Sequence, residues 1–290
     1  MLIADLDKRV HGAISQGARR SGADFRHLLV TSKIESGGNP DAKANTSSAA
    51  GLFQFTEQTW LQMVHRHGAK HGLGDEATAI ARTADGRYAV ADPAVRQQVL
   101  ALRHDGVASA QMAGELTNDN RAQLAAGLGR SPTAAELYLA HFLGVGGALK
   151  IRAAADAAVD AQASSILPAA ARANPALFAP AGRSVSAGEL VRSIETLYDR
   201  TRTSLAGVAS SPSDPPALAP HGNRAADRAR PGVGPIAAPS GDARIFSIAA
   251  LAQETLMKRY IEIATAAAGR RPPADGGRTT PTVGRTTLRD

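Results

Sequence analysis

The sequence predicts a mainly α fold, and its composition together with the spacing of its apolar residues supports this prediction. Hydrophobic residues make up 43% of the 290 residues, which suffices for a core, whereas aromatic residues make up only 4%. Alanine is very abundant, and this residue favours closely packed helices over strands. Apolar residues also recur at helical intervals, beginning with Leu6, Val10 and Ile14 in a first helix expected over residues 1–20.

A second helix is expected to begin near Ser21, because Ser21 and Asp24 resemble the paired residues of a helix-start box. Leu28 belongs to the apolar stripe of this helix. Glu35 lies about two turns further on, near the same buried side. Glycines 37 and 38 then end the helix, since glycine readily adopts the left-handed conformation of a C-terminal cap.

Glu35 is therefore expected at the rim of an apolar face, where partial desolvation raises the pKa of a carboxyl group. A carboxyl group that stays protonated near neutral pH is what a general acid catalyst requires. The alternative interpretation is a solvated glutamate at a helix end with no chemical role.

Further helical patterns extend over residues 94–128. Ser131-Pro132 is expected to open the next helix, because proline suits a first helical turn. This helix is predicted to run through residues 134–142 and to break at the glycine-rich stretch 144–147.

An alanine-rich helix is expected over residues 148–163. Ser186 with Glu189 then forms a capping box that starts another helix. The folded domain is predicted to span residues 1–202.

The rest of the chain is predicted to be mostly disordered. Residues 203–243 contain seven prolines and no periodic apolar pattern, which is typical of an extended linker. Residues 244–268 return to helical spacing and predict an amphipathic helix that either docks on its own domain or binds a partner. Residues 269–290 are again expected to be disordered.

The charge and cysteine content narrow the classes of partner and site. The formal net charge of +7 favours anionic partners, among them nucleic acid and the carboxylates of cell-wall peptides. No recognisable nucleic-acid-binding module is present, so nucleic acid is not expected as a partner. The absence of cysteine excludes a disulfide framework and a thiolate metal site.

Neither a membrane span nor a signal peptide is expected from the sequence. No run of eighteen apolar residues occurs, and the N-terminal stretch contains early acidic residues without an apolar segment.

Two short motifs lie between Thr31 and Trp60. Glu35-Ser36 is followed by Gly51-Leu52-Phe53-Gln54, and Asn39-Pro40 and Thr59 occupy matching positions nearby. Together these residues resemble the signature of the soluble lytic transglycosylases, enzymes that cleave the glycan strands of bacterial peptidoglycan. The resemblance covers roughly residues 20 to 200.

The resemblance implies a lysozyme-like helical domain with a substrate cleft. It implies that Glu35 is the catalytic acid and that Gln54 lines the cleft beside it. Ser36 would orient the substrate or cap the helix end. Phe53 and Phe55, which flank Gln54, are expected to belong to the core.

A third segment of the sequence is similar to another family motif, Ala-Tyr-Asn-x-Gly. Ala140 and Gly144 match, whereas His141 replaces the tyrosine and Phe142 the asparagine. A variant with Tyr-x-x-His-Phe-Leu-Gly is similar to that of phage-type and some proteobacterial transglycosylases. Tyr138 and His141 share one helix face, so both are candidates for contacting a sugar or the Glu35 carboxyl group. The alternative is that both are ordinary half-buried helix residues.

Other polar residues are not expected to form a site. The histidines at 65, 67 and 71 lack an acidic or cysteine partner close in sequence, so no metal is expected there. Asp75, Glu76 and Asp41 are not persuasive as a second catalytic carboxylate, and substrate-assisted glycosidases dispense with one. No metal or cofactor is required.

The predicted function is therefore cleavage of the β-1,4 bond between N-acetylmuramic acid and N-acetylglucosamine, with formation of a 1,6-anhydromuramic acid end. The alternatives are a hydrolytic muramidase and a non-catalytic cell-wall-binding assembly protein. Action in the periplasm or cell wall without a recognisable signal peptide then implies a dedicated export route, a phage particle or a translation start other than Met1. A wall-spanning apparatus is the partner expected for residues 244–268.

Overall fold

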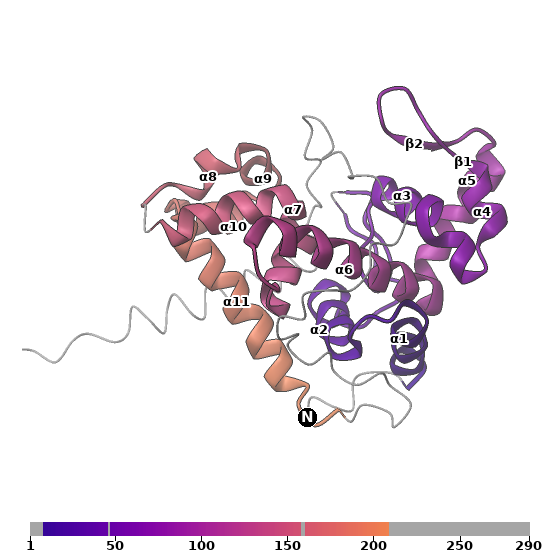
Figure 1. Ribbon diagram of the computed structural model, residues 1–290, viewed down its shortest axis with the longest axis horizontal. Coiled ribbons are helices and arrows are strands. Elements are labelled where there is room, and N and C mark those ends of the chain that lie inside the picture. Colours follow the sequence, from indigo (N-terminus) through magenta and orange to yellow (C-terminus); the bar gives the residue numbers. More distant parts are fainter. Residues whose placement is uncertain (1–7, 46, 158–159, 209–290) are drawn as a thin grey trace, which may run out of the picture.

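The computed structural model describes residues 8–45, 47–157 and 160–208, which form a mainly helical protein (Figure 1). The predicted mainly α class is confirmed. Within these ranges, no helix combines the length and the apolar character needed to cross a bilayer. No membrane span was expected from the sequence either.

Several sequence predictions lie outside the described residues. They are the start of the first helix (1–7), most of the predicted linker (209–243), the predicted amphipathic helix (244–268) and the C-terminal segment (269–290).

The first half of the described chain contains helices and a small β-hairpin. Its elements are α1 (Lys8–Ser21), α2 (Phe25–Ser36), α3 (Glu57–His67), η1 (Gly68–His71), α4 (Gly74–Ala79), β1 (Ile80–Arg82), β2 (Tyr88–Val90), α5 (Pro93–Ala101) and η2 (Leu102–His104). Strands β1 and β2 pair in antiparallel register, with Ile80 opposite Val90. The hairpin projects from the molecule beside α4 and α5 (Figure 1).

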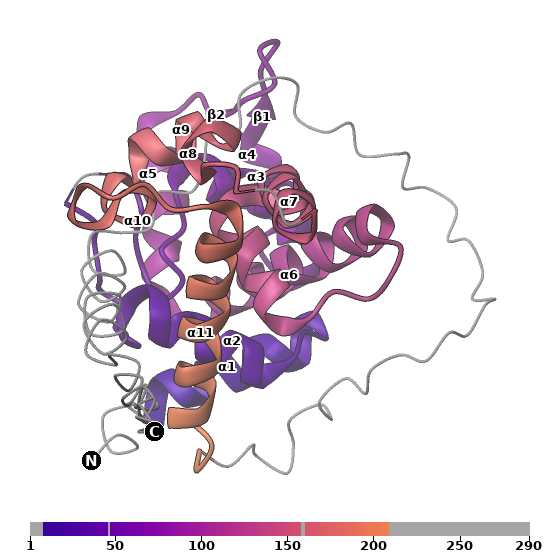
Figure 2. The same ribbon diagram turned by 90° about the vertical axis from the view of Figure 1, so that its left-hand side faces the viewer.

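The second half begins with two long helices and ends with another. Its elements are α6 (Gly106–Leu128), α7 (Ala134–Asp156), α8 (Ala163–Ile166), α9 (Pro168–Ala173), α10 (Pro175–Phe178), η3 (Pro180–Gly182) and α11 (Ala187–Ser204). Helix α11 packs against both α7 and α2 (Figure 2). This packing brings residues near 200 beside the helix that ends at Ser36.

Small residues allow α1 and α6 to lie close together. Gly17 faces Ala110 and Gly114 faces Ser21, and an added Cβ at either glycine would overlap its neighbour. Close approach of two backbones is a common reason for glycine in a helix. Helix α1 is therefore an integral part of the folded domain.

The largest fully buried side chains of the core are mostly aromatic residues and leucines. Phe53 and Phe55 are fully buried, as expected from the sequence. Trp60 lies beside Phe55 in an edge-on arrangement, and its indole N–H donates to the carbonyl oxygen of Val99 at 2.7 Å. Burial of each such side chain contributes about 1.5 to 3 kcal/mol. These contacts anchor the loop that follows α2.

The start of α2 differs from the prediction. Ser21 ends α1, and its hydroxyl donates to the carbonyl oxygen of Gly17. Asp24 is the N-cap of α2, where its carboxylate accepts from the backbone N–H of His27 at 2.7 Å. The predicted pairing was wrong because an aspartate caps a helix directly, without a second polar residue.

The boundaries of α7 differ from the prediction in a similar way. Thr133, and not Ser131, caps the helix, in a reciprocal capping box with Glu136. The break predicted at residues 144–147 is confirmed, because Gly144 has a φ of 69° and ψ of 160° inside the helix. After this kink the helix ends at Asp156, earlier than expected, and Ala163 instead opens α8.

The capping box of Ser186 and Glu189 is confirmed at the start of α11. This helix continues past Arg202 to Ser204, so the folded region extends slightly beyond the predicted boundary. The hairpin of β1 and β2 was not predicted at all. Its three-residue strands are too short to give a periodic signal.

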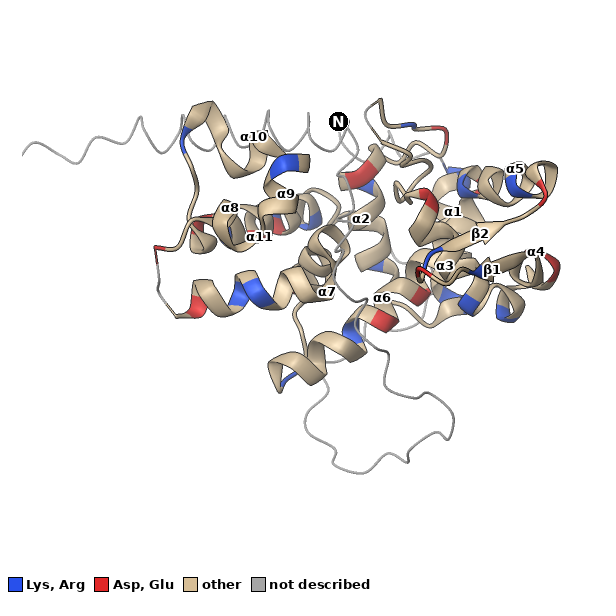
Figure 3. Ribbon diagram, turned by 90° about the horizontal axis from the view of Figure 1, so that it is seen from above, with Lys and Arg blue, Asp and Glu red and all other residues tan. Residues whose placement is uncertain are grey.

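Charged residues of both signs lie along the helices (Figure 3). Many are paired: Arg152 contacts Glu195 at 3.0 Å and Asp156 at 2.8 Å. Exposed pairs of this kind contribute little to stability. The positive charge of the chain therefore does not by itself define a binding face.

Candidate active site

Glu35 lies in the last turn of α2, and its side chain is buried. Gly37 follows as the C-cap, with a φ of 68°, and its N–H bonds back to the carbonyl oxygens of Lys33 and Ser32. The end of the helix is therefore where the sequence predicted it. Only 3% of Glu35 is exposed, so the carboxyl group is removed from bulk water.

Two side chains from α7 contact the Glu35 carboxyl group. The hydroxyl of Tyr138 donates to Oε1 at 3.0 Å, and Nε2 of His141 lies 3.5 Å from the same oxygen. The rings of Tyr138 and His141 are stacked, with centroids 5.9 Å apart and an angle of 13° between their planes. The structure thus brings together three of the residues that the sequence singled out.

The environment keeps these groups uncharged near neutral pH. Burial raises the pKa of Glu35 from 4.5 to about 8, and the Tyr138 hydrogen bond offsets this only in part. Burial lowers the pKa of His141 from 6.5 to about 4. At pH 7 the site therefore pairs a protonated carboxyl group with a neutral imidazole and a neutral phenol.

Ser36 connects the end of α2 to the loop that carries the second motif. Its hydroxyl lies 2.8 Å from the carbonyl oxygen of Leu52 and 3.1 Å from that of Ser32. It also accepts from the backbone N–H of Asn39 at 3.1 Å. These hydrogen bonds connect the first motif to the second. That Ser36 contacts a substrate stays a prediction.

Gln54 holds the loop of the second motif closed. Its Nε2 donates to the carbonyl oxygens of Gly51 at 2.8 Å and Ala42 at 3.2 Å. Its backbone has a φ of 49°, a left-handed conformation that is uncommon for residues other than glycine. Its buried Oε1 has no hydrogen-bond partner in the described part of the chain. A strained residue with an unpartnered acceptor is typical of a functional site, but the role of Gln54 as a sugar ligand stays a prediction.

Glycine is required at position 51. Gly51 has a φ of 80°, and an added Cβ would overlap the carbonyl oxygen of Arg103. Arg103 in turn donates to the carbonyl oxygen of Phe55, so η2 and the loop hold each other. The second motif therefore gains its shape from a segment about fifty residues further along the chain.

No second carboxylate is among the contacts that the described residues make with Glu35. Asp41 is exposed in the turn after α2, where its N–H bonds to the Asn39 side chain. Asp75 and Glu76 lie in the first turn of α4. The site consequently presents a single buried acid.

His67 and His71 form a polar cluster with two acids that the sequence did not reveal, whereas Nδ1 of His65 lies 2.9 Å from the carbonyl oxygen of Ile80. His71 and Lys70 contact Oε1 of Glu115 at 2.7 and 2.6 Å, and His67 contacts Asp119 at 3.0 Å. In the described ranges, no group of these residue types has an arrangement that could hold a metal ion. Both acids come from α6, 44 and 52 positions after their histidine partners, so no local motif in the sequence indicated them.

Two residues next to the site were not singled out from the sequence. His27 lies two turns before Glu35 on α2, and Tyr198 comes from α11, 171 positions after His27. Tyr198 packs against Tyr138 with ring centroids 6.0 Å apart. The spacing of His27, Thr31 and Glu35 along one face of α2 was the available signal for His27.

A comparison with models of known protein families found no match to this chain.

Proposed function

We propose that this protein is a lytic transglycosylase that cleaves peptidoglycan between N-acetylmuramic acid and N-acetylglucosamine. A lysozyme-like domain with a cleft at Glu35 is part of this proposal. The observation that carries it is the buried Glu35 carboxyl group, which has neutral partners and a pKa raised to about 8. The two motifs around Glu35 and Gln54 support the choice of substrate.

In the first step, Glu35 would protonate the oxygen of the glycosidic bond. Tyr138 and His141 both contact Oε1, so Oε2 is the oxygen that remains to carry the proton toward the substrate. Bond cleavage would leave a carboxylate in an apolar setting. The hydrogen bond from Tyr138 would then strengthen, because its acceptor becomes charged.

Positive charge would develop at the anomeric carbon as the leaving sugar departs. Since no second carboxylate contacts Glu35 among the described residues, the carbonyl oxygen of the substrate's own acetamido group would stabilise this charge. Glu35, now ionised, would accept the proton of the 6-hydroxyl group as its oxygen bonds to the anomeric carbon. The product would be a 1,6-anhydro ring, and Glu35 would end protonated, as it began.

The alternative enzyme is a hydrolytic muramidase, in which water replaces the 6-hydroxyl group. The burial of Glu35 favours the transglycosylase, because a dry site excludes the competing water. A non-catalytic wall-binding protein would have no need for a carboxyl group whose burial opposes its ionisation. The proposed substrate places the site of action in the periplasm or cell wall.

Mass spectrometry of purified peptidoglycan after digestion tests the proposal. We expect muropeptides that end in 1,6-anhydromuramic acid, lighter by one water than hydrolysis products. Glu35→Gln is the matched control and should leave the glycan strands intact. Products with reducing ends alone would make the protein a hydrolase, and no cleavage by the unmodified chain would contradict the enzymatic function.

A further inference from the structure

Four aromatic rings form a continuous row behind the candidate acid. His27 packs against Tyr198 with centroids 5.7 Å apart, Tyr198 against Tyr138 at 6.0 Å, and Tyr138 against His141 at 5.9 Å. The row starts on α2, crosses α11 and passes along α7 before it returns to α2 at Glu35. Side-chain contacts thus connect α2, α11 and α7, and they begin and end on α2.

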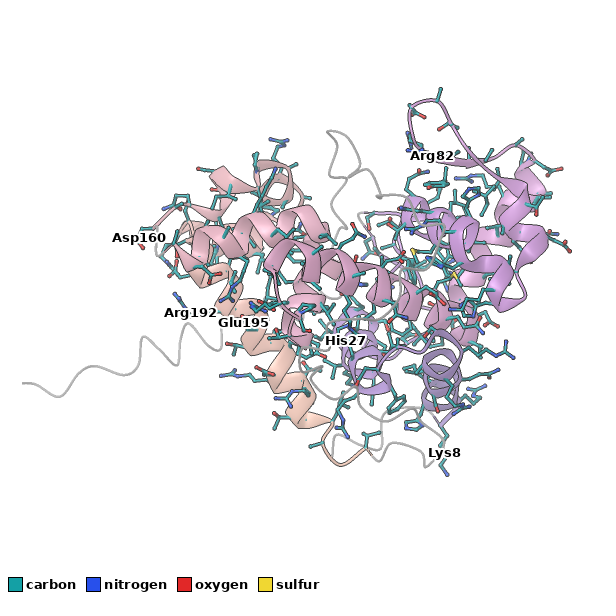
Figure 4. All side chains as sticks on the ribbon, in the orientation of Figure 1. Lys8, His27, Arg82, Asp160, Arg192 and Glu195 are labelled. Atoms are coloured by element: carbon teal, nitrogen blue, oxygen red, sulfur yellow. The ribbon has the colours of Figure 1, made fainter. Side chains whose placement is uncertain are left out.

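The far end of this row is fixed by a buried hydrogen bond. Nδ1 of His27 lies 2.9 Å from the hydroxyl of Tyr198. His27, which is labelled in Figure 4, is 4% exposed and Tyr198 is 2% exposed, so both groups are shielded from water. A buried polar pair of this kind is destabilising unless it is satisfied, and each of these groups has the other as its partner.

The backbone at His27 is also held in place. The N–H of His27 bonds to the Asp24 cap, which fixes the first turn of α2. His27 and Glu35 lie eight residues apart on this helix, about 12 Å along its axis, and so share one face. A movement of Tyr198 would therefore be transmitted to Tyr138 while the two ends of α2 stay in place.

Burial, more than nearby charges, favours the neutral form of His27. Burial, reinforced by His141 and Arg121, lowers the pKa of His27 to about 3. Burial also raises the pKa of Tyr198. The pair consequently keeps one hydrogen bond between two neutral groups near neutral pH.

We propose that His27 and Tyr198 are positioning residues, which hold the Tyr138 ring so that its hydroxyl group stays on Oε1 of Glu35. They do not contact the carboxyl group and act through Tyr138. This inference rests on the proposed function for its kinetic consequences, whereas its structural consequence at Glu35 can be measured without any substrate.

The first variant is Tyr198→Phe, which keeps the ring row and removes only the hydroxyl group. We expect kcat to fall about 5-fold with KM unchanged, a fraction of the about 100-fold loss that a misplacement of about 1 Å causes. His27→Phe should have the same effect. Tyr88→Phe is the matched control, because Tyr88 also packs against a histidine, His65, but lies in the hairpin.

The double variant separates positioning from stability. Each single change leaves one buried polar group without a partner, so each should lower Tm. Removing both groups should restore much of the Tm, because no unpaired atom remains. If the pair positions Tyr138, kcat stays low in the double variant. Recovery of kcat together with Tm would overturn the proposal.

A titration of the Glu35 carboxyl carbon by ¹³C NMR gives a readout that needs no catalysis. The signal is assigned by its absence in Glu35→Gln. The Tyr138 hydrogen bond lowers the pKa of Glu35, so a loosened Tyr138 should raise that pKa in Tyr198→Phe. An unchanged Glu35 titration in Tyr198→Phe would overturn the positioning role, even if the protein proved to have no activity on peptidoglycan. If His27→Phe fails to fold, Tyr198→Phe alone tests the positioning role.

Discussion

Glu35 and Glu136 are buried to almost the same extent but differ in their ionisation. Their exposed fractions are 3% and 4%. Burial opposes the charge of both, yet the pKa of Glu35 is raised to about 8 and that of Glu136 is lowered below its ordinary value. Burial alone therefore does not make a buried glutamate an acid.

The partners of the two carboxyl groups, together with the shallower position of Glu136, explain the difference. Glu136 loses solvation, but Arg130 binds both of its oxygens, at 2.6 and 2.8 Å, and the N–H of Thr133 adds a third bond at 2.8 Å. Among the described residues, Glu35 receives a hydrogen bond from the neutral Tyr138, and its other contact on Oε1 is the neutral His141. A cation and a backbone donor stabilise a carboxylate, whereas a lone phenol does not offset desolvation. The contacts of Glu136 therefore stabilise a charged carboxylate in a structural ion pair. Those of Glu35 leave a protonated carboxyl group, which can donate its proton.

The largest expected effect is the loss of activity in Glu35→Gln. We expect kcat to fall by at least about 100-fold, since general acid catalysis contributes about 10² to 10⁴. The fold should survive, because the amide keeps the shape of the side chain. Release of muropeptides from purified peptidoglycan measures this, with Glu136→Gln as the control that should remain active when folded. A Glu35→Gln protein that cleaves at the normal rate would remove Glu35 from the chemistry.

Tyr138→Phe should have the next largest effect on activity. It removes the hydrogen bond to Oε1, and a hydrogen bond to a charged group contributes about 1.5 to 3 kcal/mol, equivalent to about 10-fold to 100-fold in kcat. Tm should change little, since the ring remains. Steady-state kinetics with thermal melting check this. Unchanged kcat in both Tyr138→Phe and His141→Ala would show that the pair is only structural.

Glu136→Gln should instead lower stability. We expect the free energy of unfolding to fall by about 1 to 3 kcal/mol. Breaking a fully buried ion pair costs about 3 to 5 kcal/mol, but here about half of the Arg130 side chain is exposed. Denaturant unfolding measures it, and Glu35→Gln is the comparison that should not be destabilised. Equal losses in the two variants would contradict the contrast between the sites.

The pH dependence of stability should differ between the unmodified protein and Glu35→Gln. The pKa of Glu35 is 4.5 when unfolded and about 8 when folded, so between these values ionisation favours the unfolded chain. The Tm of the unmodified protein should therefore fall relative to that of Glu35→Gln as pH rises from 4.5 to about 8. Each kcal/mol lost from the free energy of unfolding lowers Tm by about 2 to 4 °C.

A second pH limb serves as the internal control. The pKa values of His27 and His141 are lowered to about 3 and about 4, so both proteins should lose stability together as pH falls below 6.5. Melting curves across the pH range give both limbs. A constant Tm difference between the two proteins from pH 5 to pH 8 would mean that Glu35 is ionised in the folded state.

Local signals in the sequence predicted much of the fold. The cap at Gly37, the break at Gly144 and the capping box of Ser186 with Glu189 depend on residues a few positions apart. The contact of Glu35 with Tyr138 was predicted because the resemblance to a family brought two distant segments together. The start of α2 was misplaced because Ser21 and Asp24 are both acceptable caps, and the packing of α1 on α6 decides between them.

The contacts that the sequence did not reveal join residues far apart in the chain. Glu115 lies 44 positions after His71, and Tyr198 lies 171 after His27. Neither pair shares a helix or a turn, so no periodicity reports it. The unusual backbone of Gln54 was equally hidden, because its φ of 49° follows from the closed loop and not from its side chain.

A ¹³C NMR titration of the carboxyl carbons of Glu35 and Glu136 in the unmodified protein tests the central contrast most directly. The two signals can be assigned by their loss in Glu35→Gln and Glu136→Gln. We predict that Glu35 titrates with a pKa of about 8 and Glu136 with a pKa below 4.5. A Glu35 pKa at or below 4.5 would contradict the account, because a carboxylate already ionised at neutral pH could not donate the proton that cleavage requires.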